Sequence, residues 1–584
     1  MQSATRMTRG GPETRSRDHG LLKVRVMSAL LGVVVLGTTA PIDAAGTLLS
    51  LGDRIRRRIE ASGAARQIAA DGQLIYAADA LPMFYERRAF EPVWITNGRP
   101  SAAVDSLMEA LGRAEDEGLR SVDYHLESIR ALHVAALRPA DRWNGLDTAS
   151  LVDLEMLLTD AFLTYGAHLV GGRVNPRTID AEWHAKAREV DLVSELEKAV
   201  ADGRIGTHLR GLTPVQREYA LLRRALRKYR EIAAAGGWGE VPEGSLIHPG
   251  DSDPRVPALR QRLAQSDGLD TAVPATADPV YDEGLQQAVM RFQKRHGLKD
   301  DGVVGPKTVV ALNVPAAQRA EQVALNMERW RWLPQDLGQR HILVNIAAFE
   351  TDVVEAGKTV MQMRVIVGKP YRRTPVFSDR MTYLVLNPYW NVPHNITIQD
   401  IVPKVRKDPG YLAAQRIHIM QGWQGAPRIV DPSSIDWSQV SQRNFPYWLR
   451  QDPGPLNALG RIKFMFPNEF NIYLHDTPKP EQFADEERGF SSGCIRVERS
   501  LDLAEYVLRG DPRWSRDALV AALKSDADRT VRLPEPIPVH LLYWTAWVDD
   551  EGVVHFRNDI YGRDGPLRDA FREAPPRPSS GSGG

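Results

Sequence analysis

The sequence predicts a multidomain α+β protein with a helical N-terminal part, a small three-helix unit and a mostly-β C-terminal domain. Apolar residues recur at helical spacing between residues 75 and 235, and a shorter helical pattern follows between 248 and 315. From residue 340 onward, short runs of Val, Ile, Leu and Tyr alternate with turn residues, as is typical of strands. The length of 584 residues agrees with this division, since it is enough for about three to five domains.

The composition excludes several classes of protein. Hydrophobic residues make up 43% and charged residues 25% of the chain, which excludes wholesale disorder, a collagen-like fibre and a small disulfide scaffold. The 74 basic and 74 acidic residues balance, and this argues against a nucleic-acid-binding protein. The single cysteine, Cys494, cannot form an internal disulfide or complete a multi-cysteine metal site. It is therefore an inert buried side chain, an intermolecular partner or a reactive thiol.

Residues 1–45 are predicted to be a signal peptide. Basic residues precede an uncharged, mostly apolar run at 26–39, and small residues follow at 40–45. The run is shorter than the roughly 20 residues that span a bilayer, and an uncleaved N-terminal membrane anchor is the alternative. The later sequence has no segment long and apolar enough to cross a membrane. We expect the mature protein in an oxidising, extracytoplasmic compartment, where a lone cysteine favours a chemical role.

Residues 75–240 are predicted to form a helical scaffold domain. The strongest helical stretch runs from 151 to 170 and is closed by two glycines. Another helix is predicted from 212 to 235, with Thr213 as its N-cap and Pro214 at its first helical position. The region carries no motif of its own that points to chemistry, so a structural role is preferred.

Residues 248–315 contain two predicted helices, near 254–265 and 282–296, and a third short helix that ends at Leu312. The string FQKRHGLKDDGVVGPKTVVALN resembles the three-helix type of peptidoglycan-binding domain. Its glycines suit the tight turns between short helices. The resemblance implies that peptidoglycan glycan and stem peptides are partners of this chain. The alternative is a domain that keeps the fold and has lost the binding groove.

Residues 340–545 are predicted to be mostly β. A helix is expected near 500–508, and residues 396–455, rich in Trp and Tyr with a helix near 398–405, are predicted to be an insertion. The Pro-, Ser- and Gly-rich tail at 575–584 is predicted to be disordered. The expected strands lie at 341–349, 360–367, 381–386, 462–466 and 472–475, with a late hairpin at 539–548 and 553–557.

A cysteine and a histidine in this C-terminal domain are candidates for catalysis. His475 ends an apolar strand, and Cys494 follows 19 residues later, between a glycine and another apolar run. A nearby imidazole can take the thiol proton and later protonate a leaving amine. Gly493 lets the backbone approach closely, so that the N–H groups of Gly493 and Cys494 could stabilise an oxyanion. By itself this pattern gives only a candidate pair, because a buried cysteine is most often a small hydrophobe.

The full strings around these residues are more specific. YLHDTP and RGFSSGCIRVE closely resemble the signature of L,D-transpeptidases, cysteine enzymes that cross-link peptidoglycan stem peptides. The resemblance implies that Cys494 is the nucleophile and that His475 is the general base and acid. It implies substrate-binding roles for Arg496, Tyr473 and Ser492, although Arg496 and Tyr473 could instead be structural. Ser492 stands where many members carry a second histidine. The N-terminal parts match the large, multidomain Gram-negative branch of this family, which implies a periplasmic location.

The reaction that the resemblance implies is a two-step acyl transfer through a thioester on Cys494. The donor is a tetrapeptide stem whose third residue is meso-diaminopimelate, the terminal D-alanine leaves, and the amine of a second diaminopimelate completes a 3→3 cross-link. Water as acceptor would give L,D-carboxypeptidase activity, and the same fold can attach or release a lipoprotein. A non-catalytic wall-binding protein is a further alternative. No metal or other cofactor is expected, carbapenems are implied as inhibitors, and the insertion at 396–455 is a candidate capping lid.

Overall fold

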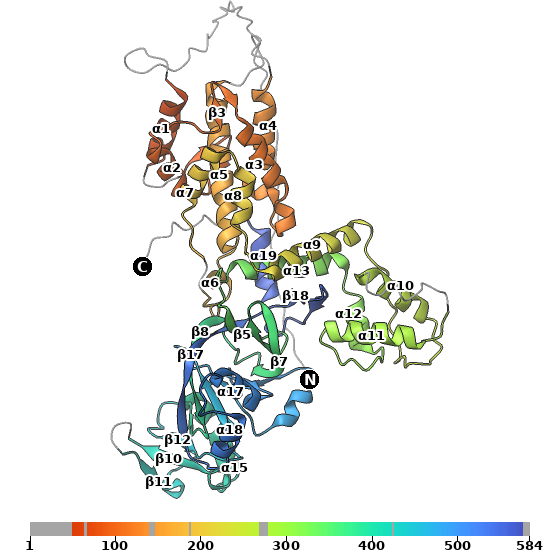
Figure 1. The fold of residues 1–584 in the computed structure, drawn as a ribbon, viewed down its shortest axis with the longest axis vertical. Helices are drawn as coiled ribbons and strands as arrows, with labels where there is room; N and C mark the ends of the chain where they lie inside the picture. Colours follow the sequence, from red (N-terminus) through yellow and green to blue (C-terminus); the bar gives the residue numbers. More distant parts are fainter. Residues whose placement is uncertain are drawn as a thin grey trace, which may run out of the picture. The chain divides into compact units, whose positions relative to one another are not determined.

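A computed structural model describes the chain at residues 49–63, 67–138, 147–185, 188–267, 278–422 and 426–575 (Figure 1). The predicted signal peptide and residues 576–584 of the predicted tail lie outside these ranges. Among the described residues, none of the helices is both long enough and apolar enough to cross a membrane.

The N-terminal part is built from helices around the long helix α5 (Thr148–Gly171), which is buried on almost all sides. Apolar residues of α1 (Leu51–Ala61), such as Ile55, share its core, so the helical part begins before residue 75. The other helices of this part are α2 Ala80–Arg87, α3 Ala102–Gly112, α4 Leu126–Ala136, α6 Pro176–Ile179, α7 Leu192–Asp202, α8 Ile205–Gly211 and α9 Arg217–Ala234.

Two buried carboxylates on α5 hold neighbouring loops in place. Glu155 accepts hydrogen bonds from the three successive backbone N–H groups of residues 93–95, the shortest of them 2.6 Å long. Asp160 accepts from the backbone N–H groups of residues 76–77 at 3.1 and 2.6 Å. Burial raises the pKa of Glu155 to about 7, against these hydrogen bonds, which act to lower it. Both acids are engaged by backbone and by side chains, among them Tyr85 for Glu155 and His125 for Asp160, which agrees with a structural role for this helix.

The start of α9 differs from the sequence prediction. The helix begins at Arg217, after Gln216, rather than at Thr213 and Pro214. The Thr213 hydroxyl instead donates a hydrogen bond to the carbonyl oxygen of Arg210 at 2.8 Å. Thr213 therefore closes the end of α8 and does not cap α9.

The three-helix unit consists of α10 (Val256–Asp267), α11 (Glu283–Arg295) and α12 (Pro306–Leu312). Asp282 caps α11, because its carboxylate accepts a hydrogen bond from the backbone N–H of Leu285 at 2.8 Å. The apolar residues of the unit form a core of their own. The three predicted helices of this region are thus present within about two residues of their expected ends.

Helix α13 (Ala316–Arg331) is not predicted from the sequence. Several of its charged residues, including Glu328 and Arg331, are fully buried, so the polar and apolar positions do not follow the helical period. Arg331 donates to the carboxylate of Glu328 at 2.6 Å and to the hydroxyl of Tyr219 at 2.9 Å. These partners satisfy the buried charges, and they become visible only in three dimensions.

The C-terminal domain is built on a nine-stranded sheet in the order β15-β7-β16-β14-β13-β8-β17-β5-β6. A further pairing of β6 with β7 closes the sheet on itself. Helices α17 (Ser500–Leu508) and α18 (Arg516–Leu523) follow its last short strands, and α19 (Asp564–Arg572) ends the described chain. The strands are β5 Arg340–Asn345, β6 Glu350–Glu355, β7 Lys358–Gly368, β8 Phe377–Leu386, β13 Ile462–Met465, β14 Leu474–His475, β15 Gly489–Ser491, β16 Ile495–Val497 and β17 Arg529–Leu542.

The late hairpin is shorter than predicted. Its strands are β18 (Ala546–Val548) and β19 (Val554–Phe556), whereas residues 539–542 belong to β17 in the main sheet. β17 carries prolines at alternate positions, and its register against β8 shifts between Arg532 and Ile537. Because proline cannot donate a ladder hydrogen bond, the sequence pattern does not predict a strand before residue 539.

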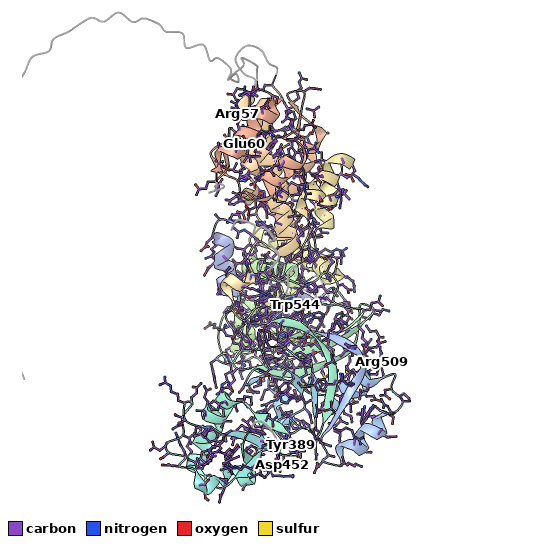
Figure 2. All side chains as sticks on the ribbon, turned by 90° about the vertical axis from the view of Figure 1, so that its left-hand side faces the viewer. Arg57, Glu60, Tyr389, Asp452, Arg509 and Trp544 are labelled. Atoms are coloured by element: carbon purple, nitrogen blue, oxygen red, sulfur yellow. The ribbon has the colours of Figure 1, made fainter. Side chains whose placement is uncertain are left out.

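The insertion forms a subdomain with a core of its own. The predicted helix near 398–405 is present as a π-helix, η4 (Thr397–Ile401), that continues into α15 (Val402–Lys407). Tyr389 and Asp452, both labelled in Figure 2, directly precede and follow the residues 390–451 that include the strands of this subdomain. A four-stranded sheet in the order β11-β10-β12-β9 completes it, with β9 Trp390–Val392, β10 Ile417–Gln421, β11 Arg428–Val430 and β12 Trp448–Gln451, beside α14 His394–Ile396 and α16 Tyr411–Ala414. The predicted fold class, a multidomain α+β chain, is confirmed.

Candidate active site

Of the predicted catalytic residues, His475 ends β14 and Cys494 directly precedes the adjacent strand β16. β14 pairs in parallel with β16, so that His475 lies opposite Arg496. The backbone N–H of Ile495 donates to the carbonyl oxygen of Tyr473 at 3.1 Å, which extends this register to Tyr473 and Cys494. Since side chains alternate along a strand, these four predicted residues share one face of the sheet. The alternate residues, such as Ile495, point to the opposite face and are buried in the core.

The loop before Cys494 is held in one conformation. Gly493 has φ = +118°, and a Cβ atom there would lie 3.3 Å from Ile472, so the position requires glycine. Thr374 Oγ1 donates to the carbonyl oxygen of Gly493 at 2.8 Å, and Ser491 Oγ donates to that of Cys494 at 2.6 Å. The Gly493 N–H itself donates to Ser491 Oγ at 3.1 Å. The oxyanion hole of Gly493 and Cys494 therefore stays a prediction, and it requires that Gly493 exchange this partner for a substrate oxygen.

The thiol of Cys494 is half-buried, with its sulfur 3.7 Å from the carbonyl oxygen of Asn471. Burial raises the pKa of this thiol above its ordinary value of 9.0. Hydrogen bonds from Tyr473 and the positive charges of Lys463 and Arg496 act in the opposite direction and favour the thiolate. The net direction means that Cys494 is protonated at neutral pH, so it needs a base in order to react.

His475 is the predicted base. The side chain is 4% exposed, and its Nδ1 donates to the carbonyl oxygen of Asp476 at 2.6 Å. A carbonyl oxygen can only accept, so Nδ1 carries the proton. Burial, followed by the charge of Arg496, lowers the pKa of His475 to about 3. The imidazole is therefore neutral at physiological pH, and Nε2 is the nitrogen that can accept a proton.

Lys463 also lies at this site, and sequence reasoning did not find it. It occupies β13 directly opposite His475, so that Arg496, His475 and Lys463 form a row across three strands. Its Nζ lies 3.9 Å from the ring centroid of Tyr473. The only signal in the sequence is a lone lysine that alternates with buried residues of the strand.

Three segments of the chain match known protein families. Residues 339–514 match the family model of the L,D-transpeptidase catalytic domain. This part of the chain is therefore similar to L,D-transpeptidase catalytic domains. Residues 252–312 match a family described as "Putative peptidoglycan binding domain", and residues 79–226 match one described as "Scaffold domain". The family resemblance of all three parts is therefore confirmed.

The similarity to individual proteins covers part of the chain. A Haemophilus influenzae protein named "Putative L,D-transpeptidase" is 37% identical over 244 residues, which are 42% of this chain and 48% of that protein. The chain thus matches about half the length of this curated relative. The crystal structure of an L,D-transpeptidase from Xylanimonas cellulosilytica is 18% identical, and the match covers 52% of this chain and 100% of that chain with a TM-score of 0.15. A phenylalanine–tRNA ligase beta subunit of Parasynechococcus marenigrum is 34% identical over only 91 residues, 10% of its length.

Arg372 joins the inserted subdomain to the nucleophile loop, residues 491–494, which carry the predicted nucleophile. Its Nη1 donates to Ser492 Oγ at 2.7 Å, two residues before Cys494. The same guanidinium forms an ion pair with Asp400 of the π-helix and donates to Gln399 Oε1 at 2.6 Å. Ser492, which was predicted to bind substrate, is thus engaged by Arg372. A change in the position of the insertion would act directly on the nucleophile loop through this contact.

Arg496 and Tyr473 lie on the same sheet face as His475, and their predicted roles in substrate binding stay predictions. Arg496 Nη1 donates to Gln482 Oε1 at 2.9 Å, while its buried Nε has no hydrogen-bond partner among the described residues. Burial, with the nearby Cys494 as the second cause, raises the pKa of Tyr473 well above 10.0. Tyr473 is therefore a neutral hydroxyl that can donate a hydrogen bond to the sulfur.

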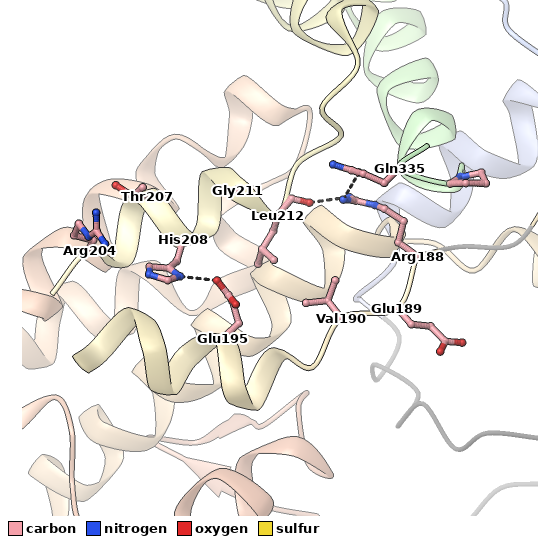
Figure 3. Close-up of a pocket in the computed structure, with 11 residues that line it drawn as sticks. Arg188, Glu189, Val190, Glu195, Arg204, Thr207, His208, Gly211, Leu212 and Gln335 are labelled. Atoms are coloured by element: carbon pink, nitrogen blue, oxygen red, sulfur yellow. Dashed lines mark hydrogen bonds and ion pairs between the residues drawn. The ribbon is translucent and has the colours of Figure 1, made fainter. Parts of the chain in front are cut away.

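A hollow in the helical part contains none of these residues. It has a volume of about 790 Å³ and is lined by residues between 188 and 212 and by Pro334 and Gln335 (Figure 3). Its polar groups pair with one another, since Arg188 donates to Gln335 and His208 pairs with Glu195 at 2.5 Å. In the described parts of the chain, no group of three or more His, Cys, Asp or Glu side chains could hold a metal ion.

Proposed function

We propose that this chain is a peptidoglycan L,D-transpeptidase that forms 3→3 cross-links through a thioester on Cys494. One observation carries the proposal. The only thiol of the chain lies on the same sheet face as His475, a neutral base, within a segment that matches the L,D-transpeptidase catalytic domain family. The pair has the chemistry that acyl transfer requires, a nucleophile that must lose a proton and a base that can accept it.

In the first step, Nε2 of His475 takes the thiol proton while the sulfur of Cys494 bonds to the carbonyl carbon of the donor's diaminopimelate. The carbonyl electrons move to oxygen, and backbone N–H groups of Gly493 and Cys494 stabilise the resulting charge. The electrons return, the bond to the nitrogen of D-alanine breaks, and the imidazolium gives its proton to that amine. D-alanine leaves and a thioester remains.

In the second step, the side-chain amine of another stem's diaminopimelate attacks the thioester. His475 accepts the proton that this amine loses and returns it to the departing sulfur, so the enzyme is restored. The new amide links the third residues of two stems. If water takes the place of the amine, the product is a shortened stem, and if a lipoprotein amine does so, the product is an anchored lipoprotein.

The other domains fit the same proposal. Peptidoglycan is an extracytoplasmic polymer, and we place the protein in the periplasm, where the three-helix domain holds glycan near the catalytic domain. A carbapenem offers a strained carbonyl in place of the stem, and Cys494 is the group that it would acylate. The inserted subdomain covers the donor stem in this proposal, with Arg372 as its link to the nucleophile loop.

Mass spectrometry of the muropeptides formed by the purified protein tests the proposal. Disaccharide-tetrapeptides should give 3→3 dimers and free D-alanine, and Cys494→Ala should give neither. A matched control is Lys358→Met, an exposed residue at the start of β7, which should keep full activity. Dimers that persist in Cys494→Ala would refute the nucleophile assignment. Shortened stems without dimers would identify water as the acceptor.

A further inference from the structure

Lys463 has no part in the steps above, although it lies in the middle of the site. The residues on either side of it, Ile462 and Phe464, are buried in the core. Its own side chain therefore emerges on the face that carries Cys494 and His475. This position makes Lys463 a group that a bound substrate would meet.

Lys463 is a cation without a counter-ion. Among the residues that the structure describes, none forms a hydrogen bond or an ion pair with its ammonium group, and its closest recorded partner is the ring of Tyr473. The acidic groups that act on it are the Cys494 thiol and the Asp528 carboxyl, while burial lowers its pKa. By contrast, Arg364 on strand β7 of the same sheet pairs with the carboxylate of Glu498 at 3.0 Å. A half-buried cation is stabilised by an anion, so an unpaired one is suited to bind an anionic ligand.

Arg496, the other cation of the row, is less free to bind an anionic ligand. Its Nη1 already donates to Gln482 Oε1, although its Nε has no hydrogen-bond partner among the described residues. Lys463 and Arg496 lie on opposite sides of His475, because each is its partner on a different neighbouring strand. The two cations can therefore meet different parts of a substrate that lies across the imidazole.

We propose that Lys463 binds the C-terminal carboxylate of the donor stem, the carboxylate of the D-alanine that leaves. This inference rests on the proposed function, which brings the adjacent carbonyl to Cys494. One residue separates that carbonyl from the carboxylate, a distance of about 3–4 Å along an extended chain. The carboxylate therefore lies within a side chain's reach of the nucleophile, near Lys463, whose ammonium group has no acidic partner among the described residues. The pairing would select stems with a free terminal carboxylate as donors.

Calorimetric titration of the full chain carrying Cys494→Ala tests this inference, because no turnover occurs. The two ligands are a tetrapeptide stem that ends in D-alanine and the same stem that ends in D-alaninamide. The free acid should bind about 10–100-fold more tightly than the amide, as expected for a charge-assisted hydrogen bond. Adding Lys463→Met to this variant should abolish the preference, because the affinity for the free acid falls while the affinity for the amide is unchanged. Lys463→Arg should retain part of it, and Lys358→Met should leave it unchanged.

Two results would overturn the inference. A preference for the acid that survives in Lys463→Met would place the carboxylate elsewhere. An equal loss of affinity for the acid and the amide would mean that Lys463 acts on the thiol or stabilises the fold and does not bind the carboxylate. Either result would leave the proposed function intact, as long as the enzyme with Cys494 forms 3→3 dimers. Absence of dimers with that enzyme would count against the proposed function itself.

Discussion

Alkylation of Cys494 by iodoacetamide should accelerate steadily with pH, without a plateau near neutrality. Burial raises the thiol pKa above 9.0, and the thiol form is therefore favoured at every pH below that value. At pH 7, less than about 1% of Cys494 is thiolate. Since only the thiolate reacts, the rate should rise about tenfold for each pH unit from about pH 6 to about pH 9.

The single cysteine makes this a clean measurement. Because Cys494 is the only cysteine of the sequence, adducts that peptide mass spectrometry locates on a thiol all report on this residue. The charge of Lys463 favours the thiolate, so Lys463→Met should raise the thiol pKa further and slow alkylation at a fixed pH. Lys358→Met, which changes an exposed lysine of the same domain, should have no effect.

A different pH profile would refute this reasoning. If Cys494 and His475 rested as a thiolate–imidazolium pair, alkylation would be fast and constant through neutral pH and would slow only in acid. Such a plateau would contradict both the raised pKa of Cys494 and the lowered pKa of His475. It would also mean that His475 acts first as an acid.

Further predictions concern the pH profile, the nucleophile loop and the insertion. His475 should stay neutral well below its ordinary pKa of 6.5. The plot of kcat/KM against pH should therefore show no fall between about pH 7 and about pH 5, and a fall near pH 6.5 would contradict the lowered pKa of His475. Gly493→Ala should destabilise the fold by about 1–2 kcal/mol and lower kcat, measured by thermal unfolding and turnover, and an unchanged kcat would show that the loop adapts. Asp400→Asn should lower kcat with little change in stability, because its ion pair with Arg372 is partly exposed, and wild-type turnover would exclude the proposed link.

The parts of the fold that local pattern determines could be predicted from the sequence. The strand predicted at 360–367 and the helix predicted near 500–508 each show a regular apolar pattern. Both are present where expected, as β7 and α17. Helix α13 could not be predicted, because it buries charges such as Arg331 against partners that are distant in sequence. The first half of β17 is hidden by its prolines, and its strand character depends on pairing with β8.

The residues of the candidate active site also differ in whether the sequence alone predicts them. Cys494 and His475 stand in strings whose resemblance to L,D-transpeptidases is specific, so both could be named from the sequence. Lys463 could not, because a single lysine in a strand is usually a solvated surface residue. Its position beside His475 depends on the register between β13 and β14. The contact of Arg372 with Ser492 likewise joins residues 120 positions apart, and no local pattern signals it.

The mass of the enzyme after brief reaction with a tetrapeptide donor tests the proposed nucleophile most directly. We predict an increase equal to the donor minus D-alanine, located on the peptide that contains Cys494. The adduct should form more slowly in His475→Gln and should be absent in Cys494→Ala. Cross-linked product formed by Cys494→Ala, or turnover that never modifies Cys494, would contradict the covalent mechanism.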